Sequence, residues 1–245
     1  MTEQERLMYQ VIGKISEVNA PIVFKGALIT KLILEENGYT MTERPTNDID
    51  ANWIGEPPTM DELADLVNKA LASFEGGMCA EPIRAYAPDK SAGIQIIDNE
   101  SGIPIISMDI SIKPVIGSRL YYYGELTIRG VVPEAVLCDK ISVLSGERIF
   151  RRCKDLLDVY ALANCLEICT DEIYDALEKS GRALGSFEAF CTRCADLEHA
   201  YNKMRGVVGK PDFDEVYAYL GGFLEPFIMS NRKSMIWVGN KGSWS

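Results

Sequence analysis

The sequence lacks any long apolar run, and its beginning lacks the features of a secretory leader. No stretch of about 18 or more consecutive residues is apolar, which is the length that a membrane-spanning helix needs. Residues 1–10 are charged, whereas a signal peptide has a basic flank followed by an apolar segment. We therefore expect a protein that stays in the cytoplasm and does not enter a membrane.

Histidine is scarce as well, and the cysteines show no clear disulfide or zinc pattern. His199 is the only histidine, so a Ser-His-Asp triad or a histidine-rich metal site lacks its components. The seven cysteines are an odd number, so they cannot all pair in disulfides. Four of them lie in helical patterns, namely Cys165, Cys169, Cys191 and Cys194. Reduced, buried thiols fit this distribution better than a disulfide framework or a zinc site.

Basic residues are outnumbered by acidic ones, 25 to 36, so the net charge is −11. A broad nucleic-acid-coating surface needs many Lys and Arg residues on one face, and this composition argues against one. One segment departs from the rest: Arg148, Arg151, Arg152 and Lys154 lie close together in the chain. These residues are the candidate for a local basic groove.

The apolar pattern predicts an α+β protein. Helical spacing indicates helices over residues 4–18, 27–36, 59–74, 133–144, 150–165, 170–179, 186–205 and 213–224. Strand-like runs cover residues 22–24, 48–53, 82–87, 93–97, 104–112 and 121–128, with a hairpin turn over 98–102. A mixed strand-and-helix half thus precedes a helical half.

This pattern suggests three segments. Residues 1–132 form the first region, which carries the candidate chemistry, and residues 133–230 form a helical region expected to pack on it. Residues 231–245, with their Gly and Ser residues, are expected to be a poorly ordered tail.

Two aspartates stand out in the strand over residues 48–53. Asp48 and Asp50 alternate with Ile49 and Ala51, so both carboxylates lie on one face with about 6.5 to 7 Å between their backbones. Two carboxylates at that separation can share a divalent metal ion. The alternative is that the segment is the exposed face of a half-buried strand.

A third carboxylate lies in a strand of the same kind. Asp109 shares one face of its strand with Ser107 and Ser111. If this strand is the neighbour of the Asp48 strand, three carboxylates converge, and such a triad suits two-metal phosphoryl chemistry. Upstream, Lys25, Gly26 and Ala27 join a strand end to a helix start, where free backbone N–H groups receive phosphate.

These elements together resemble the AbiEii-type nucleotidyltransferase family of the polymerase-beta superfamily. The resemblance is carried by Phe24-Lys25-Gly26-Ala27-Leu28, by Arg44-Pro45-Thr46-Asn47-Asp48-Ile49-Asp50, by Asp139-Lys140, and by the segment from Arg152 to Tyr160 with its Arg-x-Lys-Asp-x-x-Asp-hydrophobic-Tyr pattern. It covers roughly residues 20–165. Ala27 departs from the wider superfamily, where a second Gly or a Ser is common at this position.

The resemblance implies a polymerase-beta-like nucleotidyltransferase core over residues 1–132. It also implies a nucleoside triphosphate held by the Gly26 turn and, through Mg²⁺ (or Mn²⁺), by the aspartate pair. Lys140 and Lys154 would contact phosphates, and Asp158 would position Lys154 or the nucleotide. Relatives are commonly toxins of toxin-antitoxin systems, and some act on tRNA; a cognate antitoxin and an RNA acceptor are therefore expected partners.

Asp109 is then the third metal ligand or the base for the acceptor hydroxyl. Other readings of the residues stay open. Lys154 and Asp158, four apart, could be a solvated ion pair. The protein could bind a nucleotide or a partner protein with little turnover, or it could be a metal-dependent phosphodiesterase that uses the same carboxylates.

Overall fold

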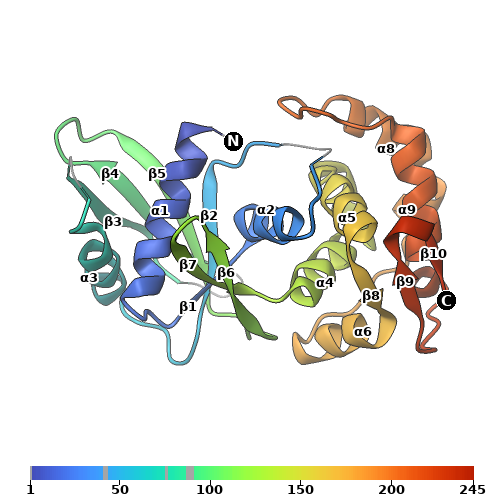
Figure 1. Ribbon diagram of the computed structural model, residues 1–245, viewed down its shortest axis with the longest axis horizontal. Helices are drawn as coiled ribbons and strands as arrows, with labels where there is room; N and C mark the ends of the chain where they lie inside the picture. Colours follow the sequence, from blue (N-terminus) through green and yellow to red (C-terminus); the bar gives the residue numbers. More distant parts are fainter. Residues whose placement is uncertain (1, 41–43, 75–76, 87–90) are drawn as a thin grey trace. The chain divides into compact units, whose positions relative to one another are not determined.

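The computed structural model describes residues 2–40, 44–74, 77–86 and 91–245. It contains two compact units, each formed by two stretches of chain. Unit 1 comprises Met1–Leu32 and Pro45–Val132, and unit 2 comprises Ile33–Arg44 and Pro133–Ser245. Figure 1 shows the strands of the large sheet in unit 1 and the helices of unit 2.

Within the described residues of unit 1, seven strands form one mixed sheet in the order β3-β4-β5-β2-β1-β7-β6. The strands are β1 (Ile22–Lys25), β2 (Asp48–Trp53), β3 (Met78–Arg84), β4 (Ala92–Asp98), β5 (Pro104–Ser111), β6 (Ser118–Tyr123) and β7 (Leu126–Val131). Strand β2 runs antiparallel to β1 and parallel to β5. The Asp48 and Asp109 strands are therefore neighbours, which the sequence had left open.

The two faces of this sheet differ in chemistry, as the period of two predicts. Ile49, Ala51 and the paired Met108 and Ile110 are buried almost completely. Asp48 on the opposite face is exposed. The apolar face is therefore the core side of the sheet, and the face that carries the aspartates stays accessible.

Three helices belong wholly or partly to unit 1: α1 (Glu3–Glu17), α2 (Gly26–Glu36) and α3 (Met60–Leu71). Both α1 and α3 begin with a capping box, formed by Thr2 with Glu5 and by Thr59 with Glu62. Helix α1 contacts α3 and β7, and α3 contacts β3. Their fully buried apolar stripes supply the helical layer of the core.

Unit 2 is mainly helical. Its elements after Val132 are α4 (Pro133–Leu144), the 3₁₀ helix η1 (Glu147–Arg151), α5 (Lys154–Cys165), α6 (Thr170–Lys179), α7 (Glu188–Thr192), α8 (Cys194–Asn202) and α9 (Phe213–Ile228). A small antiparallel sheet of order β10-β9-β8 joins β8 (Glu167–Cys169), β9 (Ile236–Val238) and β10 (Ser243–Trp244), and η2 (Gly239–Lys241) lies between β9 and β10. An α+β architecture is thus confirmed.

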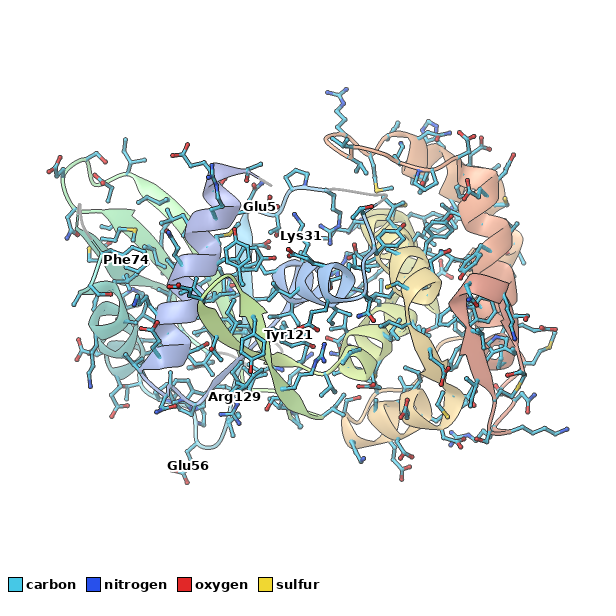
Figure 2. All side chains as sticks on the ribbon, viewed as in Figure 1. Glu5, Lys31, Glu56, Phe74, Tyr121 and Arg129 are labelled. Atoms are coloured by element: carbon cyan, nitrogen blue, oxygen red, sulfur yellow. The ribbon has the colours of Figure 1, made fainter. Side chains whose placement is uncertain are left out.

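Two predicted elements are each split in the structure. The strand expected over 121–128 is a hairpin of β6 and β7, because Gly124 has a φ of +57° and reverses the chain. Figure 2 labels Tyr121 on β6, whose hydroxyl donates to the carbonyl of Val131. The helix expected over 186–205 is divided at Arg193, whose ψ of 45° interrupts the helix. Of the strand expected over 82–87, residue 87 lies outside the described residues.

The C-terminal segment differs most from its expectation. Instead of a poorly ordered tail, residues 236–244 form β9, η2 and β10. Trp237 is buried, and its indole N–H donates to the carbonyl of Ala163.

The same segment satisfies a backbone carbonyl of α9. Pro226 lies inside α9 and has no N–H to donate to the Gly222 carbonyl. The indole N–H of Trp244 donates to that carbonyl instead, at 3.1 Å.

None of the helices in the described part of the chain combines the length and apolar composition that a membrane crossing requires.

Candidate functional site

One row of residues crosses the polar face of the sheet in unit 1. Backbone pairing aligns Arg84 of β3 with Gly93 of β4, Gly93 with Asp109 of β5, Asp109 with Asp50 of β2, and Asp50 with Lys25 of β1. Paired residues in a ladder point to the same face. We call these five residues the charged row. It brings two of the three predicted carboxylates onto directly neighbouring strands.

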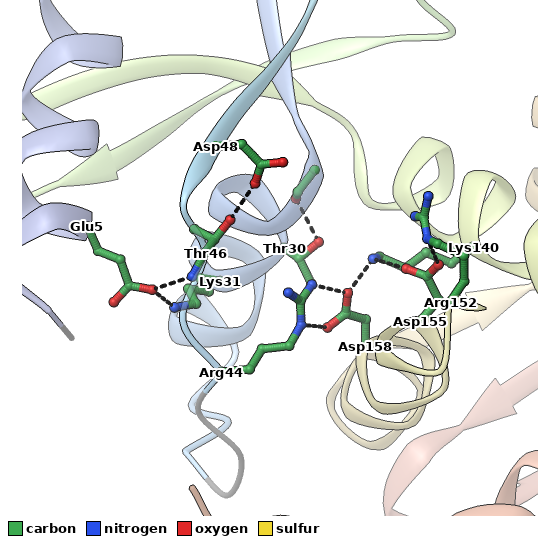
Figure 3. A network of polar contacts seen from close by, with 11 residues as sticks. Glu5, Thr30, Lys31, Arg44, Thr46, Asp48, Lys140, Arg152, Asp155 and Asp158 are labelled. Atoms are coloured by element: carbon green, nitrogen blue, oxygen red, sulfur yellow. Dashed lines mark hydrogen bonds and ion pairs between the residues drawn. The ribbon is translucent and has the colours of Figure 1, made fainter. Parts of the chain in front are cut away.

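Asp48 lies two residues before Asp50, next to the charged row, and its carboxylate has a fixed partner. The Thr46 hydroxyl donates to Oδ1 of Asp48 at 3.0 Å. The backbone N–H of Thr46 in turn donates to Oε1 of Glu5 at 3.2 Å. Glu5, which also pairs with Lys31, thereby holds the segment that orients Asp48 (Figure 3).

Glu5 is a buried hub for this segment. Only 1% of it is exposed, and it is the N3 residue of the α1 capping box. Burial alone raises the pKa of Glu5, but hydrogen bonds from Lys31 and from the backbone of Thr2 and Thr46 outweigh it and lower the pKa below its usual value. The charged form of Glu5 is therefore the one that the fold stabilises.

Gly26 is required by its close approach to Asp50. It has a φ of +70°, and a Cβ atom placed on it would lie 2.2 Å from Oδ2 and 2.8 Å from Cβ of Asp50. The Asp50 carboxylate thus lies against Gly26, the first residue of α2. The N–H groups in the first turn of a helix have no hydrogen-bond partner within the helix. Gly26 and Ala27 provide the strand-to-helix turn that the sequence predicted.

Lys25 places its ammonium group on the same polar face. Its Nζ donates to Oδ1 of Asn52 at 2.7 Å and to Oγ of Ser111 at 3.2 Å. Asn52 and Ser111 are themselves backbone partners in β2 and β5. Lys25 therefore spans two strands beside the carboxylates and supplies positive charge to them.

Asp109 has a counter-ion that the sequence did not reveal. Its carboxylate pairs with the guanidinium of Arg84, which also donates to the carbonyl and hydroxyl oxygens of Ser91, both at 2.9 Å. Gly93 lies between Arg84 and Asp109 in the charged row, and its missing side chain leaves room for the arginine to reach across. Both partners are almost half exposed.

The donor set fits a magnesium ion held partly by substrate. Among the residues that the structure describes, no three Asp, Glu, His or Cys side chains form a preformed metal-binding group. Asp48 and Asp50 nonetheless offer hard carboxylate oxygens from one face of β2. Mg²⁺ commonly binds through one or two such carboxylates and completes its shell with water and phosphate oxygens.

A second charged cluster lies inside unit 2. Asp158 of α5 receives two hydrogen bonds from Arg44, from Nε to Oδ1 at 2.9 Å and from Nη2 to Oδ2 at 2.7 Å, and it also pairs with Lys140 of α4. Burial raises the pKa of Asp158, but the charges of Lys140 and Arg44 and their hydrogen bonds hold it well below its usual range.

The cluster continues on the same helix. Lys140 also donates to Oδ1 of Asp155 at 3.2 Å, and Arg152 donates to Oδ2 of Asp155 at 2.8 Å. Lys140, Asp155 and Asp158 are all buried, and Figure 3 draws these contacts. The ion pair weighed between Lys154 and Asp158 does not form: Lys154 is exposed, whereas Asp158 is buried and bonded to Arg44 and Lys140.

Residues of these two networks that sequence reasoning missed include Glu5, Arg44, Thr46 and Arg84. Arg44 and Thr46 stand in the quoted Arg-x-Thr-x-Asp segment, so a signal was present. For Glu5 the available signal was its position three residues after Thr2, which is the spacing of a capping box. Arg84 gave no signal, because its partner lies two strands away in the sheet.

Two carboxylates on one strand beside a glycine turn, in an α+β fold, agree with the class of nucleotidyltransferases. The particular family follows from its model, described as nucleotidyl transferase AbiEii toxin of a type IV toxin–antitoxin system, which matches residues 7–218. The chain belongs to this family of nucleotidyltransferases.

Two solved structures are similar in outline. An antigenic nucleotidyltransferase-like protein from Paracoccidioides brasiliensis is 14% identical, with 82% of this chain and 92% of that chain covered and a TM-score of 0.45. MenT4, a nucleotidyltransferase toxin from Mycobacterium tuberculosis, is 12% identical, with 93% and 90% covered and a TM-score of 0.40. No curated protein matches the sequence. The family assignment rests on the family model.

The Gly26 contact leads to a stability prediction with an internal control. Gly26→Ala should cost more than Gly38→Ala, because both glycines have a φ of +70° but a Cβ at Gly38 meets nothing within 4 Å. Left-handed strain costs about 1–2 kcal/mol in either variant, and the clash with Asp50 should add about 1–3 kcal/mol. Urea unfolding measures both. Equal losses would contradict the close approach.

The buried cluster in unit 2 leads to a pH-dependent prediction. The folded-state pKa of Asp158 lies below the unfolded value of about 3.9, so its stabilisation is complete above that pH and is lost as the pH falls towards the folded-state pKa. Asp158→Asn should therefore cost about 3–5 kcal/mol at pH 7, and the cost should shrink below about pH 4. Urea unfolding across this range tests it, with exposed Asp175→Asn as the control; a pH-independent difference would contradict the assignment.

Proposed function

We propose that the protein is a magnesium-dependent nucleotidyltransferase that transfers a nucleotide from a nucleoside triphosphate to a hydroxyl group of an RNA. The observation that carries the proposal is the placement of Asp48 and Asp50 on one strand, with Asp50 against the Gly26 turn. That arrangement puts metal-binding oxygens beside the N-terminus of α2, where phosphate oxygens are favoured.

The proposed binding of the triphosphate uses both parts of this arrangement. Asp48 and Asp50 supply the carboxylates for Mg²⁺, and the backbone N–H groups at Gly26 and Ala27 seat phosphate oxygens. Lys25 adds positive charge on the same face. When bound, Mg²⁺ neutralises the charge of the triphosphate and activates the attacking hydroxyl. Ala27 needs no side-chain hydroxyl in this scheme, since the donors are backbone groups.

Asp109 is proposed as the third metal ligand or as the base that accepts the proton of the acceptor hydroxyl. Its strand position beside Asp50 supports either role. Because the Asp109 carboxylate is paired with Arg84, either role requires Arg84 to give up that contact. An exposed ion pair contributes only about 0–1 kcal/mol, so the exchange is inexpensive.

The residues of unit 2 divide into two proposed roles. Lys140 and Asp158 are buried and bonded to each other, so they position Arg44 and the helices α4 and α5. Lys154 is exposed at the start of α5 and pairs with no acidic residue in the described part of the chain. Of the two lysines that the family pattern associates with phosphate, Lys154 is the one whose ammonium group is available for it.

Membership of a type IV toxin–antitoxin family supports the further proposal of toxic activity restrained by a cognate antitoxin. The RNA acceptor, with tRNA as the first candidate, rests on the family resemblance described above.

The proposed function predicts labelling of RNA that depends on the aspartates. Incubation with Mg²⁺ or Mn²⁺, each α-labelled nucleoside triphosphate and total bacterial tRNA should transfer label to RNA. Asp48→Asn combined with Asp50→Asn should lower the rate at least about 100-fold, as loss of main electrostatic groups does in other enzymes. Asp65→Asn, an exposed residue of α3, is the control that should keep the rate.

Other outcomes of this experiment identify the alternatives. Nucleotide binding without label in any RNA would replace the proposal with a binding protein or a different acceptor. Release of nucleotides from RNA without consumption of a triphosphate would indicate a phosphodiesterase.

The Arg84 contact predicts a change in metal affinity that does not depend on turnover. If Asp109 is a metal ligand, Arg84→Ala should strengthen Mn²⁺ binding up to about fivefold, because a competing ion pair of about 1 kcal/mol is removed. Arg84→Lys should change the affinity less. Calorimetry with Mn²⁺ measures this, with Asp109→Asn as reference. Unchanged binding in both Arg84→Ala and Asp109→Asn would exclude Asp109 as a ligand and leave the role of base.

A further inference from the structure

A cluster of exposed cations lies on η1 and the residues that follow it in unit 2. Arg148, Arg151, Arg152 and Lys154 are all exposed, and Arg193 joins them by placing its guanidinium 4.3 Å from the centre of the Phe150 ring. We call these five cations the basic surface. Three acidic residues pair with members of it, namely Glu147, Asp155 and Asp196. A positive local balance thus occurs in a chain whose net charge is −11.

The geometry of η1 orients this surface. Ile149 is completely buried and fixes the rotation of the 3₁₀ helix about its axis. Side chains three residues apart eclipse in a 3₁₀ helix, so Arg148 and Arg151 project from the same side, about 6 Å apart along the axis. That rise is comparable to the separation of neighbouring phosphates on one nucleic-acid strand.

Arg148, Arg151 and Lys154 are the part of the basic surface that is available for a ligand. In the described structure these three side chains pair with no carboxylate, whereas Arg152 and Arg193 do. A set of side-by-side cations costs electrostatic repulsion, and no carboxylate in the described structure offsets it at these three side chains. Arginine dominates the cluster, and its planar guanidinium binds phosphate oxygens in pairs.

We propose that the basic surface docks the sugar–phosphate backbone of the RNA acceptor. This inference rests on the proposed function, since it supplies the acceptor site of the same transferase. It assigns Arg148 and Arg151 to neighbouring phosphates of the RNA and keeps Lys154 for the phosphate role proposed above. It gives no sequence selectivity, because phosphate contacts position a nucleic acid without reading its bases. It also explains how an acidic protein approaches a polyanion: binding is confined to one focused surface.

The test compares two double variants of the full chain, both carrying Asp48→Asn to prevent transfer. Arg148→Ala/Arg151→Ala removes two cations from the basic surface, and Lys203→Ala/Arg205→Ala removes two exposed cations elsewhere in unit 2. Fluorescence anisotropy follows binding of a labelled tRNA and of a labelled single-stranded RNA over a range of salt concentrations. Labelled polyglutamate is measured in the same way as an acidic polypeptide, and thermal unfolding confirms that both variants fold.

The expected result is weaker RNA binding by Arg148→Ala/Arg151→Ala, with the slope of log K against log salt concentration reduced by about 1.4 for a single strand. Lys203→Ala/Arg205→Ala should keep the parental slope. Equal affinity and slope in the two variants, with RNA still bound, would overturn the docking surface and leave the RNA acceptor standing. No RNA binding by the parent would overturn both proposals. Binding of labelled polyglutamate by the parent, with no RNA binding, would assign the surface to an acidic protein.

Discussion

Asp50 and Asp109 face each other across the parallel β2–β5 ladder, and this pairing of like charges is the constraint on which the site depends. Neighbouring strands are about 4.8 Å apart, and like charges directly opposite each other destabilise a sheet. The strand order offsets this repulsion, because it places a cation beside each carboxylate on the side away from the other. Lys25 lies on β1 beside Asp50, and Arg84 reaches Asp109 from β3 across a glycine. The sheet therefore tolerates two acids side by side.

The same constraint accounts for the residues that orient Asp48. A carboxylate that is to hold a metal ion needs a fixed direction, and a residue at the start of a strand obtains little from the ladder itself. The Thr46 hydroxyl supplies a donor, and the buried Glu5 holds the backbone of Thr46. A capping residue of α1 thus also supports the loop before β2, so one side chain links helix stability to the geometry of the site.

The sequence predicted what depends on local pattern and missed what depends on pairing across the fold. Strand β2 and helix α4 have the predicted bounds, because alternation in one and a proline start in the other are local signals. The hairpin at Gly124 was missed because strand-forming residues lie directly on both sides of the turn, with only Gly124 and Glu125 between Tyr123 and Leu126. The order of the C-terminal segment could not be foreseen, because it comes from Trp237 packing against residues more than 70 positions away, such as Ala163.

The candidate site also divides into residues that local patterns indicate and contacts that only the fold brings about. Spacing was enough to propose Asp48, Asp50 and Gly26, and the topology shows that the Asp109 strand is the neighbour of theirs, which the sequence left open. The ion pair of Arg84 with Asp109 could not be found, since no pattern in the sequence connects β3 to β5. The partners of Asp158 were missed for a similar reason. Four-residue spacing pointed to Lys154, whereas the fold brings Arg44 and Lys140 to it.

The two charged networks differ in burial, and this difference separates their functions. Arg84 and Asp109 are 43% and 46% exposed, so solvent screens their attraction and a metal ion or phosphate can replace either partner at small cost. Asp158 and Lys140 are 8% and 9% exposed, and removing one partner would leave the other as a buried charge without that counter-ion. Under the proposed function, ligand exchange is therefore confined to the carboxylates of the sheet. The buried cluster cannot take part in such exchange, and what it provides is a fixed arrangement of α4, α5 and Arg44.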